Sequence, residues 1–131
     1  MTLLLDTHIW IWAANRPEKL SGKVRRELQK ATNELYLSPV SIWEAYHLEK
    51  GGRFHALKGF SHWLDQVLTS MPLREAVFNF AVAAAASRIE LPQRDWGDLF
   101  LAATASVFNL TLVTADSQLL ECSWLKTLPN D

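Results

Sequence analysis

Short apolar runs alternate with helical patterns along the whole chain, and this alternation constrains the fold more than any other feature of the sequence. The apolar runs predict buried β-strands. Strands that are separated by helices throughout predict a parallel sheet with helices on both faces. We therefore expect a three-layer α/β/α domain with a central, mostly parallel sheet of about four to five short strands. The expected strands are residues 2–5, 35–38, 72–74, 110–114 and 124–128.

Helical segments fill the intervals between these strands. Within residues 75–89, Ala81, Ala84 and Ala85 form a stripe of small side chains that favours close packing. No internal repeat, low-complexity tract or linker divides the chain, so residues 1–131 are expected to form a single domain. The expected helices are residues 7–14, 21–31, 41–50, 60–68, 75–89, 96–108 and 117–121.

The composition is that of an ordinary globular protein, with 49% hydrophobic and 21% charged residues. The single cysteine, Cys122, cannot form an internal disulfide, which favours a reducing, intracellular compartment. No signal-peptide pattern is apparent, and the longest uncharged stretch, residues 99–115, falls short of the roughly 20 apolar residues that span a bilayer. We therefore expect a cytoplasmic protein without a membrane partner.

Four acidic residues lie where apolar strands give way to helices. Asp6 and Asp116 directly follow predicted strands. Glu44 lies in the helix after the second strand, and Asp98 opens the helix that leads into the fourth. Because the carboxyl ends of parallel strands lie at one edge of the sheet, where ligands bind, we expect the four carboxylates to meet in one small pocket.

Helix capping is an alternative explanation for each acid taken singly. The two acids that follow strands can cap the helices beyond them. Ser41 with Glu44 fits a capping box, and Asp95 stands in a similar relation to Asp98. Caps need only face their own helix, however, whereas these acids would also face one another. Asp98 is the hardest to explain as part of a cap, because it is the only ionisable group on an apolar helix, where an unpaired charge costs several kcal/mol.

The crowding expected for the four acids requires a proton or a cation to relieve their repulsion. No Lys or Arg is adjacent to any of them in sequence, although the fold could bring one close. All-oxygen sites suit Mg²⁺, Mn²⁺ or Ca²⁺ rather than Zn²⁺, and Ca²⁺ loops gather their ligands within about a dozen residues. The dispersed acids therefore indicate a site for Mg²⁺ (or Mn²⁺), which is typical of phosphoryl chemistry.

The segments that contain these acids resemble the motifs of a known family. Residues 3–10, Leu-Leu-Leu-Asp-Thr-His-Ile-Trp, resemble the opening motif of PIN-domain nucleases, in particular the VapC-type toxins of bacterial toxin–antitoxin pairs. Residues 41–45 resemble the second acidic motif, residues 98–105 the third and residues 112–116 the fourth. Four motifs in the same order across essentially the whole chain are far more specific than one. The third motif departs from the usual pattern, because Leu99 stands where the family often has a basic residue.

The resemblance implies a metal-dependent endoribonuclease that hydrolyses RNA phosphodiester bonds and acts as the toxin of a toxin–antitoxin pair. Asp6 and Asp98 would coordinate the principal Mg²⁺ or Mn²⁺ ion. Asp116 would hold a second ion or orient its water shell, and Glu44 would complete the site and accept a proton. The implied partners are the RNA substrate, a cognate antitoxin protein and a second copy of the chain in a homodimer.

Residues beside these acids have structural explanations as well as functional ones. Thr114 and Ser117 flank Asp116 and could hydrogen-bond a phosphate or a metal-bound water, but strand-end and capping roles explain them equally well. His8 follows Asp6 by two residues, a position that is more typical of a packing or capping histidine than of direct chemistry.

The net charge does not indicate a nucleic-acid binder, because 13 basic residues and 14 acidic residues leave a charge of −1. If the four acids hold cations, 13 basic residues oppose 10 and the balance becomes +3. A basic cluster around the second helix predicts either a solvated face or a path for an RNA backbone. Its members are Lys19, Lys23, Arg25, Arg26 and Lys30.

Two other functions compete with the nuclease. An aspartate-based phosphohydrolase also has an aspartate after its first strand, but it requires a second aspartate two residues later, where this chain has His8. It also requires a lysine near the last acidic motif, which this chain lacks. A catalytically silent PIN-like scaffold, which would bind RNA or protein without cleavage, has no need of all four acids. The metal-dependent nuclease is therefore the preferred hypothesis.

Overall fold

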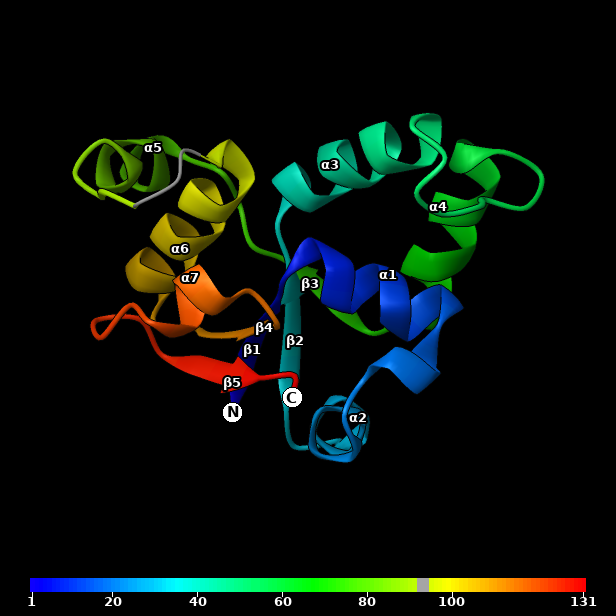
Figure 1. The fold of residues 1–131 in the computed structure, drawn as a ribbon, viewed down its shortest axis with the longest axis horizontal. Coiled ribbons are helices and arrows are strands. Elements are labelled where there is room, and N and C mark those ends of the chain that lie inside the picture. Colours follow the sequence, from blue (N-terminus) through cyan, green and yellow to red (C-terminus); the bar gives the residue numbers. More distant parts are fainter. Residues whose placement is uncertain (92–94) are drawn as a thin grey trace.

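A computed structural model describes residues 1–91 and 95–131 and shows three layers, with a parallel sheet between two groups of helices (Figure 1). Within the described residues the sheet has five strands in the order β3-β2-β1-β4-β5, and every neighbouring pair is parallel. The predicted α/β class and strand number are confirmed. The strands are β1 (Thr2–Leu5), β2 (Glu34–Leu37), β3 (Leu73–Glu75), β4 (Thr111–Thr114) and β5 (Thr127–Pro129).

All seven predicted helices are present, and the boundaries of most of them differ by a few residues. None of those in the described ranges is both long and apolar enough to cross a membrane. The helices are α1 (Thr7–Asn15), the 3₁₀ helix η1 (Pro17–Lys19), α2 (Gly22–Gln29), α3 (Pro39–Lys50), α4 (Phe60–Ser70), α5 (Phe80–Ala86), α6 (Trp96–Phe108) and α7 (Ser117–Leu120).

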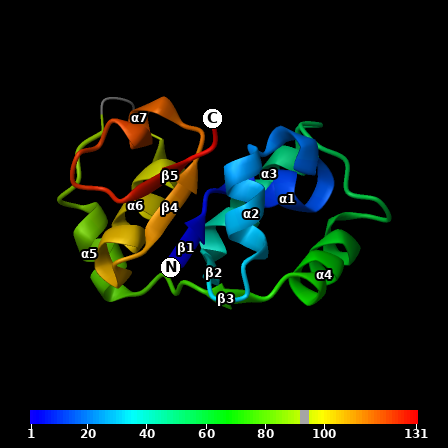
Figure 2. The same cartoon turned by 90° about the horizontal axis from the view of Figure 1, so that it is seen from below.

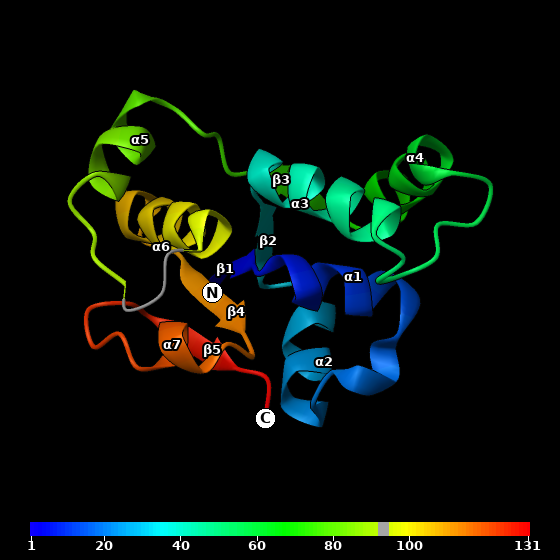
Figure 3. The same ribbon diagram turned by 45° about the horizontal axis from the view of Figure 1, so that its top comes forward.

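The two faces of the sheet carry separate hydrophobic cores, which the alternation of side chains along β1 explains. Leu3 and Leu5 belong to the core under α1 to α4, together with the fully buried Trp10. Leu4 points to the opposite core, where it joins Leu101 of α6 and residues of β4 and α7. Figures 2 and 3 show the same division, with α1 to α4 on one side of the sheet and α5 to α7 on the other.

The helix predicted for residues 75–89 is wrong in its first third. The backbone N–H of Ala76 donates to Leu37 O at 2.9 Å, so the chain is still paired with β2 where the helix was expected to begin. Helix α5 starts only after Asn79, whose Oδ1 accepts from Val82 N–H at 3.0 Å. Ala85 packs against the α5–α6 core as predicted, but the rest of the predicted alanine stripe is wrong, since Ala81 and Ala84 are exposed. Instead, the buried Val82 and Ala86 pack against Ala103 of α6.

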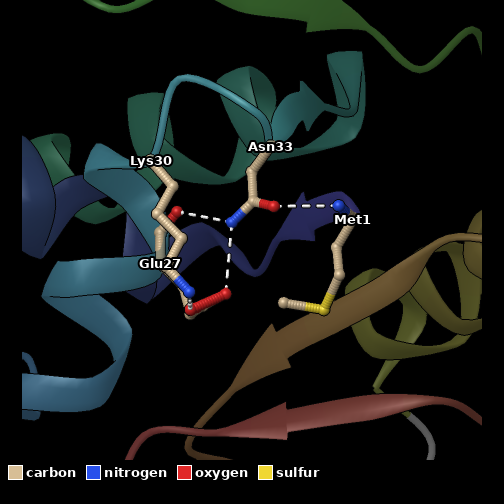
Figure 4. Close-up of polar contacts among 4 residues, drawn as sticks. All are labelled: Met1, Glu27, Lys30 and Asn33. Atoms are coloured by element: carbon tan, nitrogen blue, oxygen red, sulfur yellow. Dashed lines mark hydrogen bonds and ion pairs between the residues drawn. The ribbon is translucent and has the colours of Figure 1, made fainter.

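The amino end of β1 is fixed by a small polar network at the edge of the sheet away from Asp6 (Figure 4). The N-terminal ammonium of Met1 donates to Asn33 Oδ1 at 2.8 Å, and Asn33 Nδ2 donates to the Glu27 backbone oxygen at 2.8 Å. The Glu27 carboxylate also accepts from Asn33 and forms an ion pair with Lys30 at 2.5 Å. These contacts attach β1 to the turn that follows α2.

The order of the strands creates a crevice at the carboxyl edge of the sheet. Strand β1 is central, and the chain continues to β2 on one side and, later, to β4 on the other. Such a reversal leaves room between the helices at the carboxyl ends of the two central strands, where ligands bind in open α/β sheets. Asp6 follows β1 and Asp116 follows β4 at this position.

Candidate active site

Asp6 lies at the end of the central strand and is held by a buried hydroxyl group. Its N–H donates to Val113 O at 3.0 Å, which extends the pairing of β1 with β4. Its Oδ2 accepts from Thr114 Oγ1 at 2.6 Å, and the N–H of Asp116 donates to the same Oγ1 at 3.0 Å. Burial raises the pKa of the Asp6 carboxyl, against a lowering by the Thr114 bond. Asp6 occupies the N-cap position of α1 without a side-chain cap bond, so the capping alternative is wrong for it.

Glu44 lies in the second turn of α3 and not in a capping box. The helix begins at Pro39, and Ser38 Oγ accepts from Val40 N–H at 3.1 Å. The helix was predicted to start at Ser41, and this start is wrong by two residues. Proline at the first helical position, after a serine, is a strong start signal that outweighs the serine three residues later.

The hydroxyl group of Thr7 connects α1 to α3 at the site. Thr7 Oγ1 donates to Glu44 Oε1 at 2.5 Å and shares a 2.8 Å hydrogen bond with the buried Ser41 Oγ. Burial raises the pKa of the Glu44 carboxyl, the Thr7 bond lowers it, and the charges of Asp6 and Asp95 raise it again. The net direction is upward, so Glu44 binds a proton more readily than an exposed glutamate.

Asp98 lies in the first turn of α6, and the pKa of its carboxyl is raised well above the usual range. Asp95 Oδ1 accepts from Asp98 N–H at 3.0 Å, so the predicted cap by Asp95 is confirmed. Burial raises the pKa of Asp98 to about 7, and the nearby charges of Asp95, Asp6, Asp116 and Glu44 contribute in the same direction. Acids from four separate segments therefore act on one carboxyl group.

Asp116 is both a helix cap and a residue of the pocket. Its Oδ1 accepts from Leu119 N–H at 3.1 Å, which confirms the cap of α7 and leaves Oδ2 outside that bond. Thr114 and Ser117, which were predicted as possible contacts of a phosphate or a metal-bound water, differ in burial. Thr114 is buried below the pocket, where its hydroxyl serves Asp6 and Asp116, and Ser117 is exposed and does not line the pocket.

The predicted acids share one pocket of about 740 Å³ at the carboxyl edge of the sheet, a volume typical of ligand sites. Asp6, Glu44, Asp98 and Asp116 all line it. Asp95, which the sequence analysis treated only as a cap, is the fifth acid in its wall. The remaining lining residues are Thr7, His8, Trp12, Trp43, His47, Leu48, Gly51, Arg53 and Ala115.

Arg53 and Trp43 are pocket residues that the sequence analysis did not identify. Arg53 follows the Gly51-Gly52 turn that ends α3, and its N–H donates to Leu48 O at 2.9 Å, which folds the chain back toward the pocket. The fold thus brings a basic residue to the acidic pocket, although no Lys or Arg is adjacent to the four acids in sequence. Trp43 precedes Glu44 on α3 and is 64% exposed.

The close approach of α6 to α3 depends on Gly97. This residue is buried in the first turn of α6, between Asp98 and the cap. A Cβ atom added there would overlap the carboxylate of Glu44. The absence of a side chain at Gly97 therefore lets the second and third acidic segments meet.

The donor set fits a hard divalent cation. Asp6, Asp98 and Asp116 supply only carboxylate oxygens, which suit Mg²⁺ or Mn²⁺. Among residues 1–91 and 95–131, no three acidic, His or Cys side chains are already gathered as closely as metal ligands. Mg²⁺ commonly binds through one or two carboxylates and keeps several waters, so it does not require such a cluster. Burial and the charges of the neighbouring acids together raise the pKa of Asp98, and a cation would relieve the part of this rise that the charges cause.

Comparisons with known proteins agree with this geometry. The PIN domain family model matches residues 3–125. The chain is 27% identical over 121 residues to ribonuclease VapC22 of Mycobacterium tuberculosis, which covers 90% of this chain and 89% of that protein. It resembles VapBC2 of Rickettsia felis bound to a promoter DNA fragment, with a TM-score of 0.76, 21% identity and full coverage of both chains. It also resembles DNA-bound VapBC of Salmonella typhimurium, with a TM-score of 0.71, 16% identity and coverage of 100% and 99%. The three-layer fold is thus the PIN fold, and the chain belongs to the PIN domain family.

Proposed function

We propose that this protein is a metal-dependent endoribonuclease that hydrolyses RNA phosphodiester bonds as the toxin of a toxin–antitoxin pair. The observation that carries the proposal is the convergence of five acids on one pocket, with Asp98 raised in pKa to about 7 by its burial and its acidic neighbours. The relative named ribonuclease VapC22 supports the choice of RNA as substrate.

Asp6, Asp98 and Asp116 would hold the Mg²⁺ or Mn²⁺ ion. When bound, the ion would lower the pKa of a water and neutralise charge on the phosphate. Thr114 fixes the orientation of Asp6 through its 2.6 Å hydrogen bond. Thr7 occupies Oε1 of Glu44 and leaves Oε2 to accept a proton from the attacking water. With water as the nucleophile, the expected products carry 5′-phosphate and 3′-hydroxyl ends.

The test is cleavage of RNA by the purified chain and by the Asp98→Asn variant, in Mg²⁺, in Mn²⁺ and in EDTA. We expect cleavage by the unmodified chain only with a divalent ion, and loss of at least about 100-fold in the variant, the order found when a key electrostatic group is removed. The Asp65→Asn variant is the matched control, because Asp65 is exposed on α4 and does not line the pocket. Equal rates for the Asp98→Asn variant and the unmodified chain would refute the assignment.

The proposed partners are a cognate antitoxin and a second copy of this chain. The antitoxin is supported by structures described as VapBC and as a toxin–antitoxin complex from Klebsiella pneumoniae, to which this fold is similar. The homodimer is supported by the exposed apolar residues around the start of α5, where Phe80 is 96%, Val77 42% and Phe78 40% exposed. Light scattering of the purified chain and of a Phe80→Ser variant tests the dimer, which should dissociate in the variant.

A further inference from the structure

A second hollow lies beside the acidic pocket. It has a volume of about 460 Å³, and its walls come from α1, η1, α3, α4 and the segment between α3 and α4. His8, Trp12, Leu48 and Arg53 line both hollows, so the two are adjacent. A ligand bound over the acids can therefore extend into the second hollow.

The second hollow has the opposite electrostatic character to the acidic pocket. No Asp or Glu is among the described residues that line it. Arg16 is partly neutralised by an exposed ion pair with Glu18 at 2.9 Å. Lys19 and Arg53 form no ion pair within the described parts of the chain. Its basic and imidazole side chains are those of His8, Arg16, Lys19, Arg53 and His55.

An ordered aromatic face lies at the rim of the acidic pocket. Trp43 is 64% exposed, and it stacks on Tyr46 with ring centroids 5.6 Å apart and an interplanar angle of 22°. His47 packs edge-on against Trp43, with ring centroids 4.5 Å apart, and holds the indole from a second side. A flat, exposed and immobilised ring is suited to stacking on an unpaired base, whereas the bases of a duplex are already stacked on one another.

We propose that the second hollow binds the phosphates of an unpaired RNA strand that flank the bond held in the acidic pocket, while a neighbouring base stacks on Trp43. This inference rests on the proposed nuclease function and adds to it the path of the strand, with Lys19 and Arg53 at its phosphates and Trp43 at a base. A strand on this path would place one phosphate at the acids that would hold the metal ion and the next phosphates at the cations Lys19 and Arg53. Phosphate contacts of this kind position a strand without reading its sequence.

A protein segment matches this hollow less well than RNA does. A basic peptide would be repelled by Lys19 and Arg53, because like charges across an interface oppose binding. An acidic peptide could satisfy the two cations, but it would cover the exposed indole of Trp43 only with an aromatic side chain at the right place, whereas every nucleotide carries a base. An RNA strand satisfies both features.

The experiment measures binding to the Asp98→Asn chain, in which cleavage is expected to be lost. Fluorescence anisotropy follows a labelled, unstructured RNA of about 12 nucleotides, within the range of single-strand sites. The same sequence is measured as a duplex, at constant Mg²⁺ and increasing KCl. Two further changes are made in that background, a Lys19→Ala/Arg53→Ala pair and a separate Trp43→Ala substitution. The matched control is Lys23→Ala/Arg25→Ala, which removes the same charge from exposed positions of α2 outside both hollows.

We expect the single strand to bind at least about 10-fold more tightly than the duplex. The Lys19→Ala/Arg53→Ala pair should weaken single-strand binding and flatten the slope of log affinity against log salt by about 1.4, or about 0.7 for each lost phosphate contact. Trp43→Ala should weaken binding by about 10-fold, the effect of one lost base stack, without a change of slope. The control pair should retain nearly all affinity.

Equal affinity for duplex and single strand, or equal losses in the control and hollow variants, would overturn the proposal. Unchanged RNA binding in the hollow variants together with loss of antitoxin binding would also overturn it and assign the hollow to the protein partner. Cleavage of the same RNA by the unmodified chain tests the nuclease separately. Selective binding without cleavage would therefore reject the nuclease and leave the strand path in place.

Discussion

Replacement of Asp98 with asparagine should stabilise the metal-free protein above neutral pH while it removes activity. In the fold, burial and four neighbouring acids raise the pKa of Asp98 from 3.8 to about 7. The folded protein therefore binds this proton more tightly than the unfolded chain does, and stability falls as pH rises through that interval. Above about pH 7, Asp98 is ionised in both states and its unfavourable contribution is complete.

The size of the effect follows from the same two pKa values. Each pH unit between them corresponds to ~1.4 kcal/mol, so the interval from 3.8 to about 7 sets an upper bound of ~4 kcal/mol. Asp98 is only half-buried, and solvent screens its repulsion, so we discount this bound to ~2 kcal/mol. For a domain of this size, ~2 kcal/mol corresponds to a rise in melting temperature of roughly 6–10 °C.

Urea unfolding of both proteins in EDTA, from pH 4 to pH 8, measures the difference. The Asp98→Asn variant should match the unmodified chain near pH 4 and exceed it by ~2 kcal/mol at pH 8. The exposed Asp65→Asn control should show no such divergence. Millimolar Mg²⁺ should then narrow the gap, because the ion binds and stabilises only the protein with an intact site. An Asp98→Asn variant that is no more stable than the unmodified chain at pH 8 in EDTA would refute the electrostatic reasoning.

Three smaller changes test how the other acids are held. Thr114→Val leaves the buried Asp6 carboxylate without its donor, so we expect a loss of ~1–3 kcal/mol in urea unfolding and a slower RNA cleavage, both restored by Thr114→Ser. Gly97→Ala should displace the Glu44 carboxylate and lower the cleavage rate at least about 10-fold, with stability changed by less than ~1 kcal/mol because the obstructed atoms end a flexible side chain. Asn79→Ala removes the cap of α5 and should cost ~1 kcal/mol in thermal unfolding without a change in cleavage rate; a comparable loss of activity would contradict the placement of α5 outside the site.

The fold was largely predictable because a chain in which strands and helices alternate can pack into only a few layer arrangements. Errors arose where two local signals competed. Ser38 and Ser41 both precede helical sequence, and the Ser38-Pro39 pair determines where α3 starts. At residue 76, alanine favours a helix, but pairing of Ala76 with Leu37 holds the chain in the sheet. Tertiary contacts of this kind override helix propensity, and a single sequence does not display them.

Asp6 and Asp116 were predictable because topology alone places strand ends together, whereas the approach of Glu44 to Asp98 also depends on Gly97. Arg53 and Trp43 were not predictable, because their positions depend on how α3 ends and on which of its faces turns toward the sheet. The Gly51-Gly52 turn indicated the end of α3, and Gly52 has a positive φ of 75°. Nothing in that turn specifies that Arg53 returns to the pocket, since this depends on its contact with Leu48.

The choice of hydrogen-bond donors at the site favours cation binding. Two carboxylates that need a fixed orientation receive it from neutral hydroxyl groups, Asp6 from Thr114 and Glu44 from Thr7. In the described ranges, none of the pocket acids forms an ion pair. A lysine or arginine in either place would orient the carboxylate equally well, but it would cancel the charge that attracts the metal ion. Hydroxyl donors orient the carboxylates without neutralising them. The pocket therefore keeps a negative potential, which adds to the effect of burial on the pKa of Asp98 and which a divalent ion would relieve.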